Sequence, residues 1–191
     1  MLKSLVFTLR FKIVLLVKGL QNFWPFDSST NDLISQRNMT IQLNGQLVSD
    51  RLGNAESALR LSKGYGTVPS DIYFDPDSGG FAIMTWLKLI STGGYQRVID
   101  FGTGCSDNVI LCTYDTSTKM FLQTRIGTTT TNFQSTGSLV LGVWTHVTVT
   151  GNRTMRAFYF NGIFDSKIAG FYNISSFHFK NILSKFCLFL I

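Results

Sequence analysis

The chain carries very few of the residues that hydrolytic sites need. Glu56 is the single glutamate, and the two histidines are His146 and His178. Hydrolysis of glycosidic bonds usually requires two carboxylates, about 5 Å apart for retention and about 6.5–9.5 Å apart for inversion. No alternating stretch of this sequence places two carboxylates on one side of a strand, and His146 has no nucleophile-elbow serine nearby. We therefore expect that the protein is not an enzyme.

Cysteine is also scarce. The three residues Cys105, Cys112 and Cys187 show neither a CxxC motif nor cysteine–histidine spacing. A zinc site and a complete disulfide framework are therefore not indicated. A bridge between Cys105 and Cys112 stays open if the chain turns between them, but we favour free, half-buried thiols.

Long hydrophobic runs are missing. Residues 5–20 are apolar, but Arg10 and Lys12 interrupt them and leave only Ile13 to Val17 unbroken. This run is shorter than the roughly 7–15 residues of a signal-peptide core and the roughly 20 of a membrane span. We expect no stable membrane span, and we assign residues 1–20 to either an apolar, basic leader or a first strand.

The basic excess lies at the two ends of the chain. The net charge is +6, but residues 21–166 carry ten basic and eleven acidic side chains, a net of −1. Nucleic-acid binding requires basic residues concentrated on one docking face. The charge distribution therefore argues against a nucleic-acid partner.

The residues that are present alternate as strands do. Phe81, Ile83 and Leu87 fall on one side of an extended segment whose other side carries Met84 and Trp86. Turn signals recur every 8–12 residues and no segment keeps a 3.6-residue period, which favours a single all-β sandwich. We expect strands at 39–48, 56–61, 65–68, 81–89, 96–101, 108–114, 120–126, 139–141, 143–150 and 156–160, with 39–48 forming a hairpin around Asn44-Gly45.

Six blocks in series carry a family resemblance. They are WPFD (24–27), DRLGNAESALRLS (50–62), FAIMTWLK (81–88), GYQRVIDFG (94–102), WTHVTVT (144–150) and FYFNG (158–162). In this order they resemble the laminin-G-like domains of the concanavalin A-like lectin superfamily. The resemblance implies a jelly roll of two antiparallel sheets. It also implies non-enzymatic, extracellular or cell-surface binding of a glycan or of a cell-surface or matrix protein.

The end of the chain departs from this family. Relatives continue with a glycine-rich loop and a closing strand, whereas residues 171–191 read FYNISSFHFKNILSKFCLFLI. We therefore expect a laminin-G-like domain at 21–167, an atypical tail at 168–191 and a sandwich that is incomplete at its C-terminus. The alternative is that residues 177–191 supply a substitute strand.

Three residues are candidates for ligand binding. In the family register, Trp86 and His146 point away from the core, and Asp100 alternates with buried neighbours. On one concave face, Trp86 would stack on a sugar ring while Asp100 and His146 fix its hydroxyls. The alternative is that they are scaffold residues, with Asp100 accepting hydrogen bonds from His146 or Arg97.

A calcium site is a further hypothesis. Asp107 and Asn108 match the place where relatives supply an acidic ligand, and Asp75 and Asp77 are a looser candidate pair. Loop Asp and Asn residues are more often turn formers. The sequons at Asn38, Asn152 and Asn173 lean towards secretion. The rival function from another class is a structural or adhesion spacer without a small ligand, and a jelly-roll glycoside hydrolase is the poorer one.

Overall fold

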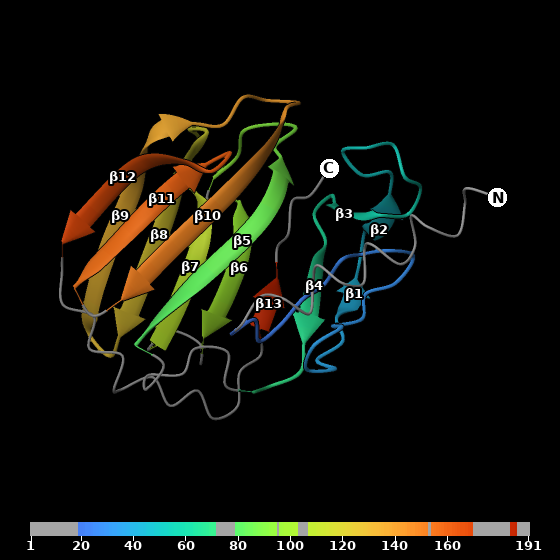
Figure 1. Cartoon of the computed structure of the whole chain (residues 1–191), viewed down its shortest axis with the longest axis horizontal. Coiled ribbons are helices and arrows are strands. Elements are labelled where there is room, and N and C mark those ends of the chain that lie inside the picture. The colour runs from blue at the N-terminus through green and yellow to red at the C-terminus, as the bar shows by residue number, and fades with distance from the viewer. Residues whose placement is uncertain are drawn as a thin grey trace.

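The protein folds as a sandwich of two antiparallel layers (Figure 1). The computed structural model describes residues 19–71, 79–94, 96–102, 107–152, 154–169 and 184–186. These residues form strands joined by turns and loops, as the all-β fold class predicts. No helix in the described part is long and apolar enough to cross a membrane.

Each layer is built around a four-stranded sheet. The front sheet has the order β12 (Ile163–Ala169), β11 (Met155–Phe160), β10 (Trp144–Asn152) and β5 (Gly80–Lys88). The rear sheet has the order β6 (Arg97–Gly102), β7 (Asp107–Thr113), β8 (Lys119–Ile126) and β9 (Thr129–Ser138). All pairings within the two sheets are antiparallel.

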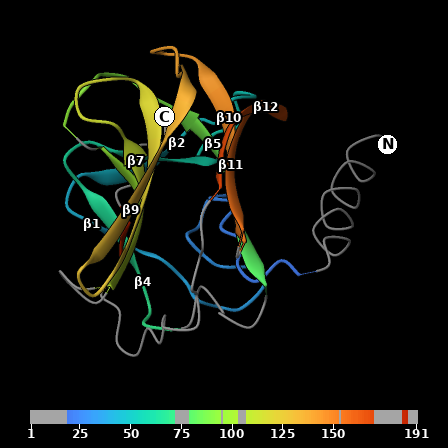
Figure 2. The same ribbon diagram turned by 90° about the vertical axis from the view of Figure 1, so that its left-hand side faces the viewer.

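Two smaller sheets extend the sandwich on one side. The first has the order β1 (Thr40–Gln42), β4 (Tyr65–Val68) and β13 (Ser184–Phe186), and β13 lies beside β6 (Figure 1). The second pairs β2 (Gly45–Val48) with β3 (Ala58–Leu61). The strands β1 and β4 therefore lie in the same layer as β7 and β9, opposite β5, β10 and β11 (Figure 2).

The core lies between the layers because strand residues alternate between two faces. On the front sheet Val147, Val149 and Phe158 are fully buried, and on the rear sheet Leu111 and Leu122 are buried equally well. Phe158 also stacks on Phe133 of β9, with ring centroids 4.8 Å apart. The side of β5 predicted to be core is confirmed: Leu87 is buried, and Phe81 and Ile83 pack against the same cluster.

Most expected strands are present, but the strand at 139–141 and one hairpin are wrong, and the strands β9 and β12 were not expected. Residues 139–141 form no strand, and Val143, expected inside a strand, is exposed just before β10 begins. Strand β9 was not expected because its buried Phe133 and Ser135 stand among exposed threonine and asparagine residues. The hairpin around Asn44-Gly45 does not form, because β1 pairs with β4 whereas β2 pairs with β3.

Part of the tail takes part in the fold. The backbone of Ser184–Phe186 pairs antiparallel with β4. This pairing agrees with the alternative in which the tail supplies a strand. Residues 1–18 of the proposed leader and residues 170–183 and 187–191 of the tail lie outside the described part, so the domain bounds 21–167 stay a prediction.

One carboxylate joins the two sheets at their outer edge. Asp165 of β12 accepts hydrogen bonds from the backbone nitrogens of Thr136 (2.9 Å) and Gly137 (2.7 Å) in β9. The main chain of β9 comes close enough for this only because Gly137 has no side chain. A Cβ there would lie 2.7 Å from Asp165 Oδ1 and 3.3 Å from the Phe160 ring. The glycine therefore closes the β9–β12 edge of the sandwich.

We expect Gly137→Ala to lower the free energy of unfolding by about 1–3 kcal/mol, because the new methyl group displaces Asp165 from two backbone donors. Urea unfolding measures the loss. Gly94→Ala is the matched control, since no atom lies within 4 Å of its Cβ position. Equal stability of the two variants would contradict the role of Gly137.

Candidate functional site

Trp86 and His146 lie side by side on the outer surface of the front sheet. They are directly opposite each other in the register of β5 and β10. Their ring centroids are 5.2 Å apart and the planes are tilted by 58°. Trp86 is 38% exposed, while its strand neighbour Leu87 is buried in the core. Two of the three predicted ligand-binding residues are therefore adjacent and accessible.

Arg51 completes this group from a loop. Its guanidinium carbon lies 4.3 Å from the centroid of the Trp86 ring, within the range of a cation–π contact. Sequence reasoning did not identify Arg51, because it lies in the β2–β3 connection, far from Trp86 along the chain. The DRLGN block containing it was the only available signal.

A tight turn fixes the backbone on both sides of Arg51. Oδ1 of Asp50 accepts hydrogen bonds from the backbone nitrogens of Leu52 (2.8 Å) and Asn54 (2.9 Å). Its Oδ2 accepts a third from the Asn54 side chain, at 2.9 Å. Burial acts to raise the pKa of Asp50, but these hydrogen bonds outweigh it and leave the pKa below its ordinary value. The turn therefore presents Arg51 from a defined position.

His146 is held as a neutral ring. Burial, and then the charge of Arg51, lower its pKa from the ordinary 6.5. Its backbone nitrogen donates to Asn161 Oδ1 at 2.9 Å, and Nδ1 lies 3.5 Å from the Thr148 hydroxyl. At neutral pH the imidazole can therefore both donate and accept a hydrogen bond at the surface.

The surrounding surface is apolar, aromatic and hydroxylated. Met84 and Phe164 are 53% and 52% exposed. Tyr159 meets Phe164 edge to face, with centroids 5.8 Å apart, and stands opposite Thr148 in the register. We call this outer surface, with Arg51 at its margin, the Trp86 face. It is defined by Arg51, Met84, Trp86, Lys88, His146, Thr148, Tyr159, Phe164 and Lys167.

Asp100 lies on the other side of the molecule. It belongs to β6 of the rear sheet and alternates with Ile99 and Phe101, which are buried in the shared core. The core thus separates Asp100 from Trp86, and the expectation that they share one concave face with His146 is wrong. Strand alternation was read correctly, but sequence could not show that β5 and β6 join different sheets.

The surroundings of Asp100 fit the scaffold alternative. Its carboxylate pairs with Arg97 at 3.1 Å and accepts a weak hydrogen bond from Asn108 Nδ2 at 3.4 Å. The expected pairing with Arg97 is confirmed, while the alternative partner His146 lies on the front sheet. Asp100 therefore ties β6 to β7.

The described residues near Asn108 do not make up a calcium site by themselves. Calcium takes six to eight oxygen ligands. Asn108 Oδ1 is buried without a hydrogen-bond partner, but the nearby Asp100 carboxylate is already neutralised by Arg97. No group of three or more His, Cys, Asp or Glu side chains that could hold a metal ion occurs within the described residues. The side chain of Asp107 and the pair Asp75 and Asp77 lie outside them, so the calcium hypothesis stays a prediction.

Cys112 is a free thiol on the rear sheet. It is 1% exposed, and burial raises its pKa to about 12. A thiol of this kind is chemically inert at neutral pH. Cys105 and Cys187 lie outside the described residues.

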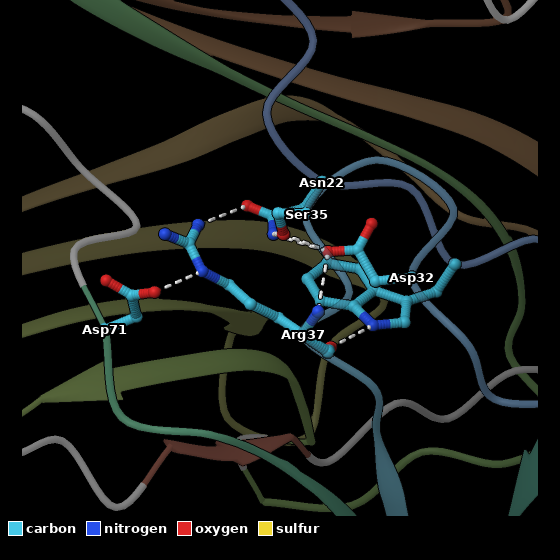
Figure 3. Close-up of polar contacts among 6 residues, drawn as sticks. Asn22, Asp32, Ser35, Arg37 and Asp71 are labelled. Atoms are coloured by element: carbon cyan, nitrogen blue, oxygen red, sulfur yellow. Dashed lines mark hydrogen bonds and ion pairs between the residues drawn. The ribbon is translucent and has the colours of Figure 1, made fainter.

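The densest polar network surrounds Asp32, in a loop for which the sequence predicted no function. Oδ1 of Asp32 accepts hydrogen bonds from the backbone nitrogens of Phe23 (2.9 Å) and Ile34 (3.0 Å). Its Oδ2 accepts from Asn22 Nδ2 at 2.8 Å and from the Ser35 hydroxyl (Figure 3). Burial acts to raise the pKa of Asp32, but the hydrogen bonds outweigh it and lower the pKa to about 2.

Arg37 connects this loop to the rest of the layer. Its Nε pairs with Asp71 at 2.6 Å, and its carbonyl oxygen accepts a hydrogen bond from Trp24 Nε1 at 2.9 Å (Figure 3). Asp71 follows β4, so the ion pair holds the loop near that strand. Because both oxygens of Asp32 are satisfied inside the protein, we interpret the network as a structural lock.

Comparisons with known proteins agree with this architecture. A laminin-G-type model of the concanavalin A-like lectin/glucanases superfamily matches residues 61–182, more than half of the chain. The protein belongs to this superfamily. No curated protein sequence matches the chain significantly.

Solved structures share the fold at low sequence identity. Domain 4 of AbnA, a GH43 extracellular arabinanase from Geobacillus stearothermophilus solved with arabinotriose, is 14% identical with a TM-score of 0.66, over 87% of this chain and 81% of that one. The binding domain of botulinum neurotoxin DC, solved with rat synaptotagmin II, is 14% identical with a TM-score of 0.63. That alignment covers 86% of this chain but only 42% of the neurotoxin chain.

Acid should weaken the Asp32 lock. Because its pKa falls from 3.8 to about 2 on folding, the carboxylate contributes about 2 kcal/mol that is present above about pH 4 and is lost as the pH falls towards 2. We expect Asp32→Asn to lower stability at pH 7 and to remove this part of the pH dependence. Urea unfolding between pH 7 and pH 2.5 measures both effects.

Asp115→Asn is the control for this experiment. Asp115 lies in an exposed turn at φ 47, a conformation that asparagine also adopts. It should leave the stability curve unchanged. An Asp32→Asn protein that loses as much stability between pH 7 and pH 2.5 as the wild-type protein does would contradict the role of Asp32.

NMR titration tests the neutral state of His146. We expect its pKa to lie below 6.5 and to rise part of the way back in Arg51→Gln, because burial remains when the neighbouring charge is removed. His146→Gln assigns the signal against that of His178. A His146 pKa above 6.5 would show that the ring is not desolvated as described.

Proposed function

We propose that the protein is a non-enzymatic recognition domain that binds a glycan on its Trp86 face. The observation that carries the proposal is the accessible group formed by Trp86, His146 and Arg51. Sugar sites combine an aromatic ring, which packs against the apolar side of a pyranose or furanose, with a few polar groups that fix the hydroxyls. Trp86 supplies the ring, and neutral His146 supplies the donor and acceptor.

The position of these residues supports rigid binding. Trp86 and His146 stand on the neighbouring strands β5 and β10 of the front sheet, so the backbone ladder fixes their spacing. A preorganised site loses less conformational entropy when it binds than a mobile loop does. Thr148 and Tyr159 continue the same surface with hydroxyl groups, which allows contact with more than one sugar residue.

The structural relatives motivate the ligand class. The AbnA domain was solved with arabinotriose, and the cell entry of botulinum neurotoxin type C is described as dependent on interaction with two ganglioside molecules. The type C structure is 14% identical to this chain, with a TM-score of 0.62 over 87% of this chain and 42% of that one. Such low identity carries only the fold, so the glycan proposal depends on the residues of the Trp86 face.

An extracellular or cell-surface location is part of the proposal. Asn38 and Asn152, the asparagines of two sequons, are exposed as glycosylation requires, and Asn173 lies outside the described residues. A glycan or matrix partner is also met outside the cell. The rival function is that of a spacer that holds neighbouring domains apart and has no small ligand.

Calcium dependence is a separate part of the proposal and rests on Asp107 and Asn108. The unpartnered Oδ1 of Asn108 gives one oxygen near the start of β7. Isothermal titration with calcium alone measures this part directly, and Asp107→Asn should abolish any heat of binding. Absence of binding in the wild-type protein would remove calcium from the account without affecting the Trp86 face.

A glycan array, with and without calcium, tests the main proposal. We expect selective binding that Trp86→Ala weakens at least tenfold. Truncating an aromatic side chain that is buried in an interface removes about 1–2 kcal/mol or more of binding free energy. His146→Ala should weaken binding to a smaller extent. Thermal unfolding of each variant checks that it is folded.

Two variants on the rear sheet are the controls. Tyr114 has the same exposure as Trp86, 39% against 38%, and follows β7. Tyr114→Ala and Asp100→Asn should both leave glycan binding unchanged. Loss of binding in either control variant, with binding by Trp86→Ala unaffected, would move the site to the rear sheet. If the folded wild-type protein binds no glycan on the array, the spacer function is favoured.

A further inference from the structure

The Trp86 face carries positive charges beside its apolar side chains. Its outward strand positions include Lys88 on β5 and Lys167 on β12, and Arg51 stands over Trp86. None of the outward positions of the front sheet in the described part carries a carboxylate. The acid of β12, Asp165, is turned towards β9 and bound there. The face is therefore cationic, although residues 21–166 carry a net charge of −1.

Arg51 is the cation best placed to act. Among the described residues, no carboxylate lies within ion-pair distance of its guanidinium. The Arg51 guanidinium packs on the Trp86 ring, and a guanidinium in this position keeps N–H donors at its rim. These donors have the fork geometry that matches the two oxygens of a carboxylate.

The neighbours of Arg51 restrict what it can bind. Hydrogen bonds between Asp50 and Asn54 hold its loop, so the backbone that carries Arg51 has a defined position beside Trp86. Lys88 is two residues from Trp86 on the same side of β5, about 7 Å along the strand. Arg51 and Lys88 are thus grouped around one aromatic ring. A cationic group of this size suits one charged sugar residue better than a long polyanion.

We infer that the ligand of the Trp86 face is a saccharide that carries a carboxylate, with Arg51 binding the carboxylate while the sugar ring packs beside Trp86. Glycan binding at this face, as proposed above, is the basis of this inference. Arg51 thereby determines specificity: it favours an acidic sugar over the neutral sugar of the same shape. His146 remains available for a ring hydroxyl.

Matched pairs of probes test the inference. Oligogalacturonate is compared with its methyl ester, and sialyllactose with lactose, by isothermal titration at two salt concentrations. We expect at least tenfold tighter binding of the acidic member of one pair and weaker binding at higher salt. Arg51→Gln should remove this preference, whereas affinity for the neutral member should change less than threefold. Arg51→Lys should restore only part of the preference, because an ammonium lacks the planar fork.

Arg125→Gln is the control variant. Arg125 lies on the outer face of the rear sheet, where its Nε donates to the carbonyl of Gly127 at 3.3 Å. It removes the same charge from the opposite side and should leave the preference intact. Loss of the preference in this variant, or its persistence in Arg51→Gln, would overturn the role of Arg51.

The outcomes separate the two levels of the account. Equal, Trp86-dependent binding of acidic and neutral members overturns the inference and leaves the proposed glycan function in place. Binding of heparin that is stronger than either acidic probe and insensitive to Arg51→Lys overturns it in favour of a general polyanion surface. No binding of any probe by folded protein overturns both.

Discussion

The packing of two strand layers against one apolar core determines where every other feature of this protein lies. Each strand shows one side to the core and the other to solvent. Whether a side chain stabilises the core or is available to a ligand therefore depends on which side of its strand it lies on. Val147 and Val149 fill the core, whereas His146 and Thr148, which alternate with them along β10, face outward. The same rule places Asp100 on the opposite surface, behind Ile99 and Phe101.

Polar residues support this packing where the strands cannot. Asp32 holds the loop before β1 by accepting hydrogen bonds from backbone and side chains, and Asp165 joins the edges of the two sheets. Asp50 acts similarly at the turn that carries Arg51. Three carboxylates are thus used for structure, whereas Arg51, over the exposed Trp86 ring, is left to interact with a partner. For this reason we propose the outer face of the front sheet as the recognition surface.

The sequence predicts the fold class and most strands, because large apolar residues alternate clearly in β5 and β10. It fails for β9, whose alternation is carried by Phe133 and Ser135 among threonines. The choice of sheet for each strand is a long-range property, so sequence could place Trp86 and Asp100 outside the core but not on different faces. Arg51 and Asp32 were missed because their partners are set by tertiary structure, not by local spacing.

The central claim is that the outer face of the front sheet is the recognition surface. Mapping amide chemical-shift changes in isotope-labelled protein during titration with a bound oligosaccharide tests it most directly, because every strand reports independently. The account predicts that the largest changes lie in β5, β10 and the turn at 50–54, with the rear sheet unmoved. Changes concentrated in β6–β9, or in the loop around Asp32, would contradict it.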